Sequence, residues 1–389
     1  FQGDAVRKNP NLKPETTISK EIGAEVRLLD GRLTADVTYY DKYTRDQIVE
    51  SELSYLSNYQ RVIINSGKIS NKGWEISVSG VPVKVKNFEW KTIFNWSKNN
   101  SMVESLPEGI DKIQIGSGVY NVKSYAEVGK PYGAIYAKTF KRDAEGYILC
   151  QLDGSPKEGQ DYEYLGCVQA DWRGGWNNVF RLGNFSFSVM FDFQKGGKFF
   201  SQTSIQSSVD GQSVKSLEGR DADFFSRKIL GESDEERYGF MRPQNANTPT
   251  ANGQIYPDWG RPKGVVLPNC RYDEDVEGLA GQQVLGYCTP ERYWMHYTSR
   301  DISRFIYDAS YVKLREITVS YDLPKKWLRK TPFQTFRVAA VGRNIATLFA
   351  NTPHGLDPQA TSTTGNAQGF ERGFNLPSAT YGFDIKVSF

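Results

Sequence analysis

The stretch 379–389 reads Ala-Thr-Tyr-Gly-Phe-Asp-Ile-Lys-Val-Ser-Phe and alternates between apolar and polar side chains from Tyr381 onward. A β-strand places alternate side chains on opposite faces. The members of the apolar face are Tyr381, Phe383, Ile385, Val387 and Phe389. Such a strand suits a membrane-spanning β-barrel, because lipid offers no hydrogen-bonding partner and a closed sheet satisfies every backbone group. One strand alone does not decide this, since soluble β-sandwich strands alternate too.

The same alternation recurs along the chain, and short turns join the alternating segments in pairs. Asp30-Gly31 and Gly183-Asn184 are strong hairpin signals between two such segments. The phase slips once, near Arg315-Glu316, and we interpret this slip as a β-bulge. The predicted strands are residues 18–28, 33–39, 74–79, 88–96, 176–182, 185–194, 306–323, 333–348 and 379–389.

Long connections alternate with these short turns. They span residues 50–60, 106–168, 201–303 and 350–378. Compact soluble domains rarely contain structureless loops beyond about 12–15 residues, whereas outer-membrane barrels combine short periplasmic turns with long extracellular loops. The fold class we predict is therefore all-β, an antiparallel transmembrane β-barrel whose last strand runs from the outside to the periplasmic face.

Composition excludes several other classes of protein. No segment approaches the roughly 18–20 consecutive apolar residues of a transmembrane helix. Aromatic residues make up 13% of the chain, which suits aromatic girdles at the membrane interfaces. The formal net charge is only +3 and the basic residues are scattered, so nothing indicates a nucleic-acid partner. The chain begins at Phe1 without a charged and apolar leader, so we expect any export signal to lie upstream.

The strand count indicates an incomplete barrel. About nine strands are predicted, and bacterial single-chain barrels have an even number. Nine strands would leave two edges with unpaired backbone groups in lipid. We therefore expect residues 1–389 to be the C-terminal part of a larger barrel.

Several short motifs are spread in order over most of the chain. They are Asn9-Pro-Asn-Leu-Lys-Pro-Glu15, Gly73-Trp-Glu75, Val128-Gly-Lys-Pro-Tyr-Gly133, Ala309-Ser-Tyr-Val-Lys-Leu-Arg-Glu-Ile-Thr318 and a Leu-Pro-Ser ending at Ser378. Together they resemble the motifs of SusC/RagA-type TonB-dependent outer-membrane transporters of Bacteroidetes. The resemblance implies a 22-stranded barrel in the outer membrane, a plug domain and energy supplied through TonB. It also implies a SusD-like surface lipoprotein that acts as a lid, and a large nutrient as substrate. The plug and the TonB box are not in this sequence.

One segment departs from the family pattern. Many members carry a calcium-loop-like stretch where this chain has Tyr147–Tyr164. Here the residues Cys150-Gln-Leu-Asp-Gly-Ser-Pro156 lack the Asp-x-Asn-x-Asn-Gly spacing of a calcium loop. The sequence therefore does not support a calcium site there, and it predicts no other metal and no cofactor.

The four cysteines all lie in predicted external loops. Loop order favours the disulfides Cys150–Cys167 and Cys270–Cys288, each closing a segment within one loop in an oxidising compartment. The alternative is four free thiols. A zinc site is not favoured, because the cysteines lack Cys-x-x-Cys spacing and a histidine partner.

No catalytic constellation is recognisable. The only histidines are His296 and His354, and the Gly-Lys pairs lack the remainder of a phosphate-binding loop. The acidic pairs Asp273/Asp275 and Asp234/Glu235 could in principle hydrolyse glycosides, but we expect them to be solvated loop residues. The stretch 216–230 is predicted to form a short helix. We therefore predict that the protein is not an enzyme.

Aromatic residues in the loops are the candidate ligand contacts, because aromatic faces stack on sugars and pack on peptide side chains. The alternative is packing within the loops or contact with the lid protein. The candidates are Tyr132, Tyr136, Trp259, Tyr293, Trp294 and Tyr297.

The sequence thus predicts an energised importer of an oligosaccharide or oligopeptide. A passive porin, or an outer-membrane adhesion or scaffold barrel, is the alternative, and an upstream plug with a TonB box would distinguish the importer from a porin. A third possibility, a soluble carbohydrate-binding β-sandwich, fails if the outward strand faces are continuously apolar.

Overall fold

The computed structural model describes residues 6–52, 59, 61–65, 67–117, 119–217, 265–288, 292–353, 355–360, 368–373 and 378–389. Its largest sheet has nine antiparallel strands arranged in chain order. They are β2 (Thr16–Leu28), β3 (Leu33–Arg45), β6 (Lys68–Val85), β7 (Phe88–Ser105), β13 (Trp172–Leu182), β14 (Phe185–Lys195), β19 (Tyr311–Asp322), β20 (Thr335–Ala350) and β22 (Thr380–Ser388).

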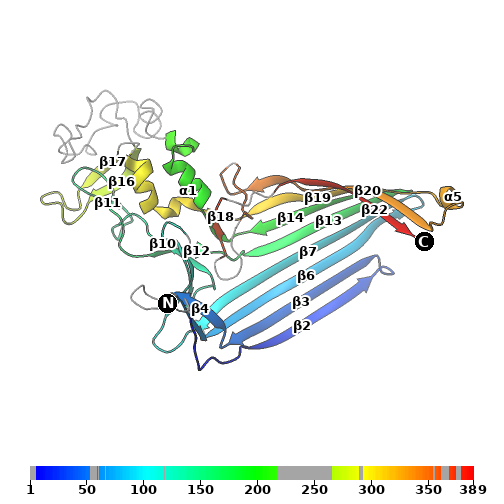
Figure 1. Ribbon diagram of the computed structural model, residues 1–389, viewed down its shortest axis with the longest axis horizontal. Coiled ribbons are helices and arrows are strands. Elements are labelled where there is room, and N and C mark those ends of the chain that lie inside the picture. The colour runs from blue at the N-terminus through cyan, green and yellow to red at the C-terminus, as the bar shows by residue number, and fades with distance from the viewer. Residues whose placement is uncertain are drawn as a thin grey trace, which may run out of the picture.

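The short turns lie at one end of this sheet and the long connections at the other (Figure 1). Asp30, Gly31 and Gly183 adopt the positive φ angles that tight hairpins require. The turn after β19 contains one helical turn, α5 (Lys325–Leu328), and the C-terminus lies at the same end. Each segment predicted to be a strand overlaps one of the nine strands. The described sheet is open, with β2 and β22 at its edges.

The predicted bulge near Arg315-Glu316 is confirmed. Met190 of β14 pairs with Glu316 and the next residue, Phe191, pairs with Leu314, so Arg315 is the extra residue. The pairing of β19 with β20 shifts at the same point. The bulge keeps the apolar side chains on one face after the phase slip.

Cross-strand pairing sorts the side chains into an apolar face and a polar face. One continuous row on the apolar face consists of Val26, Ala35, Val78, Phe94, Trp176, Phe191, Leu314 and Ala346. The adjacent row on the polar face consists of Glu25, Asp36, Ser77, Asn95, Gly175, Asp192, Lys313 and Thr347. Large side chains of the apolar face are exposed, Phe383 by 87% and Ile22 by 73%. Soluble monomers rarely present so extensive an apolar surface to water.

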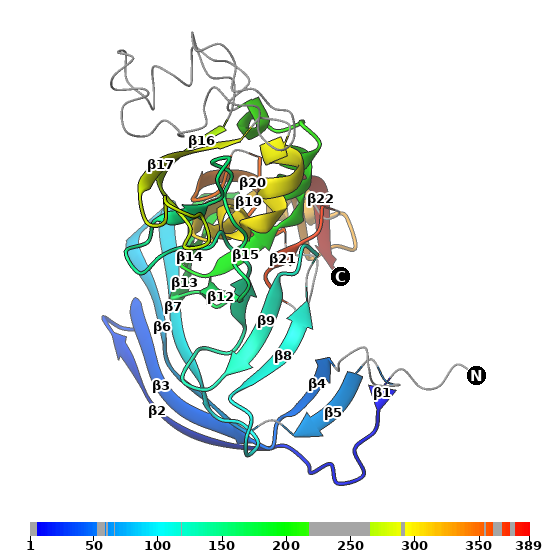
Figure 2. The same ribbon diagram turned by 90° about the vertical axis from the view of Figure 1, so that its left-hand side faces the viewer.

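The long connections fold into smaller sheets at the end of the strands opposite the short turns (Figure 1), and Figure 2 shows these sheets from that end. Residues 106–168 contribute a four-stranded sheet and one strand of a three-stranded sheet, which residues 201–303 complete. The four-stranded sheet is formed by β8 (Lys112–Ser117), β9 (Lys123–Glu127), β10 (Ala134–Ala137) and β12 (Glu163–Cys167). The three-stranded sheet is formed by β11 (Ile148–Cys150), β16 (Val265–Tyr272) and β17 (Gln283–Cys288).

Two further three-stranded sheets join the loops to the strand ends. The first contains β1 (Val6–Arg7), β5 (Arg61–Asn65) and β4 (Ile48–Glu52). The second contains β18 (Ile306–Asp308), β15 (Lys198–Ser201) and β21 (Phe370–Glu371). The predicted long loops therefore have their own secondary structure.

One helix, α1 (Gln202–Val209), follows β15 directly. The Ser201 side chain caps it by accepting a hydrogen bond from the Ser204 amide at 3.0 Å. The Ser201 hydroxyl also donates to Glu371 at 2.6 Å, which links the helix to β21. The predicted helix over 216–230 lies mostly outside the described residues; Ser216 and Leu217 end a 3₁₀ turn, η1 (Val214–Leu217). Among the described residues, no helix is long and apolar enough to cross a membrane.

Arginine substitutions at Val189 and Ser188 test the assignment of the two faces. Val189 pairs with Asn178 and Ile317 on the apolar face, while Ser188 lies on the polar face. In a lipid bilayer, Val189→Arg should cost about 2–4 kcal/mol in the free energy of unfolding, because it places a charge against lipid, and Ser188→Arg should cost much less. Denaturant titration of the full-length protein in vesicles measures both. Equal costs would contradict the assignment.

Candidate ligand-binding surface

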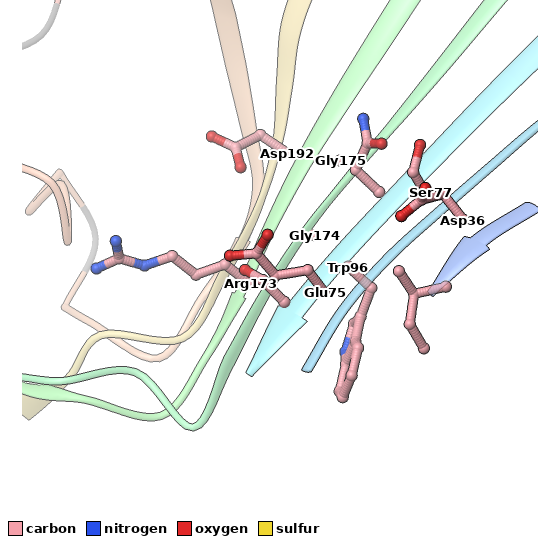
Figure 3. A pocket seen from close by; sticks show the side chains of 11 residues that line it. Asp36, Glu75, Ser77, Trp96, Arg173, Gly174, Gly175 and Asp192 are labelled. Carbon is pink, nitrogen blue, oxygen red and sulfur yellow. The ribbon is translucent and has the colours of Figure 1, made fainter. Parts of the chain in front are cut away.

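A cavity of about 500 Å³ lies on the polar face of the large sheet. Its floor follows a row of paired residues, because Asp36 lies opposite Ser77, Ser77 opposite Asn95, and Gly175 opposite Asp192. Figure 3 shows side chains from β3, β6, β7, β13 and β14 around this hollow. The cavity is lined by Asp36, Glu75, Ile76, Ser77, Asn95, Trp96, Ser97, Arg173, Gly174, Gly175 and Asp192.

The lining of this cavity contains more acidic than basic side chains. Asp36, Glu75 and Asp192 contribute three carboxylates, and Arg173 is the one basic side chain in the lining. Arg173 Nε donates to Gln194 at 3.1 Å. Carboxylates, amides and hydroxyls at one surface can accept and donate hydrogen bonds to a polar ligand. This surface is therefore suited to hydroxyl or amide groups.

A hydrogen-bonded network ties the polar face to residues 357–359. Asp192 accepts a hydrogen bond from Arg315 Nε at 3.1 Å. The Lys313 ammonium donates to Asp357 at 2.5 and 2.7 Å and to Gln359 at 2.9 Å. Lys313 is only 4% exposed, so its charge is compensated locally. The network holds this part of the last long connection against β19.

The Gly73-Trp74-Glu75 motif divides its residues between the two faces. Tyr40 lies across Gly73, and a Cβ atom at residue 73 would lie 2.4 Å from the Tyr40 hydroxyl oxygen and 2.2 Å from the Lys98 carbonyl oxygen. The Tyr40 hydroxyl donates to Asn99 at 3.1 Å. Trp74 packs against Tyr39 on the opposite face, with ring centroids 5.0 Å apart. Glycine is therefore required where the aromatic ring crosses the strand.

Tyr136 lies in a cluster of basic and aromatic side chains on the four-stranded sheet. It is buried, donates a hydrogen bond to Glu127 and accepts one from Lys130 at 2.6 Å. The Lys112 ammonium lies 3.4 Å from the centroid of its ring. Burial raises the pKa of the Tyr136 hydroxyl, and the hydrogen bond to Glu127 adds to the shift. Tyr132 is half-buried nearby, and burial raises its pKa to about 12.

Three of the other predicted ligand contacts lie together in a loop core. Tyr293, Trp294 and Tyr297 are each 2% exposed or less and belong to η2 (Tyr293–Tyr297). They pack with side chains of β11, β16 and β17. Their place in this core is the alternative that the sequence left open, namely packing within the loops. Trp259 lies outside the described residues.

None of the four cysteines is in a disulfide in this structure, so neither predicted pairing is formed. Cys150 and Cys167 belong to different sheets. Cys270 and Cys288 belong to neighbouring strands but are not opposite each other, because Cys270 pairs with Val284 and Cys288 pairs with Val265. Loop order was a poor guide because β11 pairs with a strand from a different long connection.

Of the acidic pair Asp273/Asp275, only Asp275 is a solvated loop residue as predicted, with its side chain 67% exposed. Asp273 is 2% exposed and accepts hydrogen bonds from Lys141 at 2.9 Å and Lys157 at 2.7 Å. Lys157 also bridges to Asp275. Burial alone would raise the pKa of Asp273, but the hydrogen bonds from Lys157 and Lys141 outweigh it and lower that pKa to about 2. The second pair, Asp234/Glu235, lies outside the described residues.

In the stretch 147–164, where the sequence lacks the spacing of a calcium loop, Asp153 is paired with a basic side chain of the protein. The Asp153 carboxylate accepts hydrogen bonds from Arg292 at 3.0 Å and from the Ser155 hydroxyl at 2.5 Å. A guanidinium in this position opposes the binding of calcium. Within the described part of the chain, no group of three or more His, Cys, Asp or Glu side chains could hold a metal ion.

Comparison with known proteins identifies the family. The profile of the family "TonB dependent receptor-like, beta-barrel" matches residues 1–345. The chain therefore belongs to the TonB-dependent receptor β-barrel family. This is a family of outer-membrane receptors and transporters and not of enzymes.

Curated relatives and solved structures agree with this assignment. TonB-dependent receptor P3 of Formosa agariphila is 25% identical over 96% of this chain and 33% of its own length. SusC of Bacteroides thetaiotaomicron is 29% identical over 26% of this chain and 10% of its own length. The RagAB peptide transporter superposes on 98% of this chain and 36% of its own, with a TM-score of 0.60 and 16% identity. The chain thus spans about a third of the length of P3 and of the matched RagAB chain.

A glycine-to-alanine comparison within β6 tests the close packing of Tyr40 and the Lys98 carbonyl oxygen around Gly73. Gly73→Ala should destabilise the sheet by about 1–3 kcal/mol, because the new methyl group overlaps a backbone oxygen. Gly80→Ala is the matched control in the same strand, since its Cβ would be no closer than 3.4 Å to any other residue's heavy atoms, apart from its chain neighbours. Denaturant titration of the full-length protein should separate the two. A Gly73→Ala protein as stable as the Gly80→Ala protein would contradict the argument.

Acid should weaken the loop core through Asp273. Its folded pKa of about 2 lies below the usual 3.8 of an aspartate, so its contribution to stability is present above about pH 4 and is lost as pH falls toward 2. The loss amounts to about 2 kcal/mol. Pulsed hydrogen exchange of residues 265–288 in urea should show this loss in the wild type and not in Asp273→Asn. Asp275→Asn, whose side chain is 67% exposed, is the control that keeps the acid sensitivity; a wild-type core with the same pH profile as Asp273→Asn would contradict the assignment.

Proposed function

We propose that this chain forms part of the wall of an energised outer-membrane importer for a large nutrient, an oligosaccharide or an oligopeptide. The observation that carries the proposal is the division of the large sheet into a largely apolar face and a polar face with a cavity. An apolar outer face suits lipid, and a polar inner face suits an aqueous path for solutes. Membership of the TonB-dependent receptor family supports energised import over passive diffusion.

We further propose that the nine strands form part of a closed barrel of 22 strands. The edges of β2 and β22 carry backbone groups that need partners in lipid. In this proposal the missing strands and a plug complete the transporter, and TonB supplies the energy. A SusD-like lipoprotein covers the long connections on the outer surface. The likeness to the RagAB peptide transporter supports this arrangement and favours peptides as one class of substrate.

Charged residues of the cavity would contact the polar groups of the substrate. Glu75→Gln removes one of the three carboxylates with little change in size. It should raise the half-saturation concentration for uptake roughly three- to tenfold, through loss of a charged hydrogen bond. Glu89→Gln is the matched control, because Glu89 lies on the same face near the short turns and pairs with Lys84.

Uptake of a labelled nutrient by cells that carry the full-length transporter tests this proposal. Import should stop when TonB or the proton motive force is removed, and a lipid-anchored subunit should co-purify with the protein. Uptake that continues without TonB would favour a passive porin. Equal uptake by the Glu75→Gln and Glu89→Gln variants would exclude the cavity as a contact site.

A further inference from the structure

Two of the four thiols are in direct contact. Cys150 lies in β11 and Cys270 in β16, and these strands pair in parallel with Ile148 opposite Cys270 and Cys150 opposite Tyr272. Because Ile148 and Cys150 lie two residues apart, both cysteines point to the same face of the sheet. Their side chains hydrogen-bond to each other. Both are buried, with exposed fractions of 0% and 1%.

The backbone of β16 is built to direct Cys270 toward this face. Between Leu267 and Cys270 the pairing with β17 shifts by one residue, so that Leu267 lies opposite Gly286 and Cys270 opposite Val284. Without this bulge Cys270 would point to the other face of the sheet. Asn269, within the bulge, adopts a φ of +60°, a conformation that side-chain-bearing residues rarely take.

A glycine on the neighbouring strand leaves room for the Cys270 sulfur. A Cβ atom at Gly286 would lie 2.6 Å from Cys270 Sγ and 2.9 Å from Leu267 Cβ. Cys270 Sγ also lies 3.2 Å from the Leu267 carbonyl oxygen, to which its S–H donates. With this proton directed away, a sulfur lone pair can accept the hydrogen of Cys150.

The remaining cysteines have other surroundings. Cys167 Sγ donates to the Tyr132 carbonyl oxygen at 3.5 Å and accepts from the Gln169 amide at 3.4 Å, on the four-stranded sheet. Cys288 lies in the same core as Cys150 and Cys270, where burial raises its pKa to about 12, and its charged neighbours are Arg292 and Asp153. All four cysteines are in described residues, so only one pair is prepared for a bond.

We propose that Cys150 and Cys270 form a disulfide that covalently joins the long connection 106–168 to the long connection 201–303. The bond would bring the sulfurs to about 2.05 Å, and because the two cysteines are diagonal neighbours in the register, β11 must shift against β16 as it forms. Two thiols lose two protons and two electrons as the S–S bond forms. The oxidant is a second disulfide, of a thiol–disulfide oxidase or of glutathione, which accepts them and becomes two thiols.

The consequence of the bond is mechanical. The three-stranded sheet β11-β16-β17 is the junction of the two longest connections, visible at the end of the molecule opposite the C-terminus (Figure 1). The bond closes a long segment of chain, and such bonds constrain the unfolded state strongly. The disulfide would keep the two connections together while a ligand or lid protein contacts them.

Peptide mapping tests the pairing directly, because trypsin places each cysteine in a separate peptide. These peptides are 143–157, 158–173, 264–271 and 272–292, which contain Cys150, Cys167, Cys270 and Cys288. The full-length protein is denatured in the presence of N-ethylmaleimide, so that buried free thiols also react, and is then digested without reductant. The expected result is peptide 143–157 linked to 264–271, with the other two alkylated. Any other linkage, or four alkylated cysteines, would overturn the proposal.

Two serine variants supply matched controls. Cys270→Ser should abolish the linked peptide, whereas Cys288→Ser, on the neighbouring strand and equally buried, should retain it. Reduction should speed hydrogen exchange of residues 265–272 roughly tenfold or more in the wild type. A wild type whose exchange is unchanged by reduction would count against the mechanical role.

The inference rests on the proposed function, in which the long connections lie on the outer surface of the cell, because the extracellular compartment is oxidising. The two proposals nevertheless fail separately. A transporter that imports its nutrient while all four cysteines are alkylated overturns the disulfide alone. A protein that carries the linkage without TonB-dependent uptake overturns the proposed function alone.

Discussion

The structure depends on one constraint, the pairing of backbone N–H and C=O groups between neighbouring strands whose outer side chains are apolar. Neither an apolar solvent nor a packed apolar layer can replace a missing backbone hydrogen bond. The nine strands meet this requirement by antiparallel pairing in chain order from β2 to β22. Irregularities occur within this sheet, and the bulge at Arg315 is one that restores the alternation of faces.

Fixed strand pairing has a second consequence. It places apolar side chains on one face of the sheet and polar side chains on the other. A residue such as Val189 faces the apolar side while its neighbour Ser188 faces the polar side. The cavity near Asp36, Glu75 and Asp192 exists because rows of polar residues from five strands align. The Gly73 motif is divided between the faces in the same way. Gly73 leaves room for Tyr40 on one face, and Trp74 packs against Tyr39 on the other.

The strands could be predicted from sequence because their signals are local. Alternation, the Asp30-Gly31 turn and the phase slip at Arg315 each lie within a few residues, and the structure has a strand, a turn and a bulge at these places. The family resemblance, carried by short motifs, was also confirmed. The cavity was not predicted, because its residues come from five strands and meet only through register.

The long connections could not be predicted, because their contacts join segments far apart in sequence. Asp273 is buried between Lys141 and Lys157, which lie in a different connection, and no local pattern signals that position. Tyr293 and Trp294 have no period that distinguishes an exposed loop aromatic from a buried one, and they proved to be buried. Pairing cysteines within one connection failed because β11 pairs across connections with β16.

The loop layer and the nine-stranded sheet, here called the wall, are therefore in contact but are ordered by different interactions. The wall is ordered by local alternation and backbone pairing, whereas the loop layer is ordered by small apolar cores and buried ion pairs. The two meet where the buried Lys313 and its neighbour Arg315, both on β19, contact Asp357 and Gln359. Removing the partner of a buried ammonium is costly, so the segment 355–360 is held to the wall more strongly than surface contacts alone would hold it. Any movement of that segment must break these contacts or carry β19 with it.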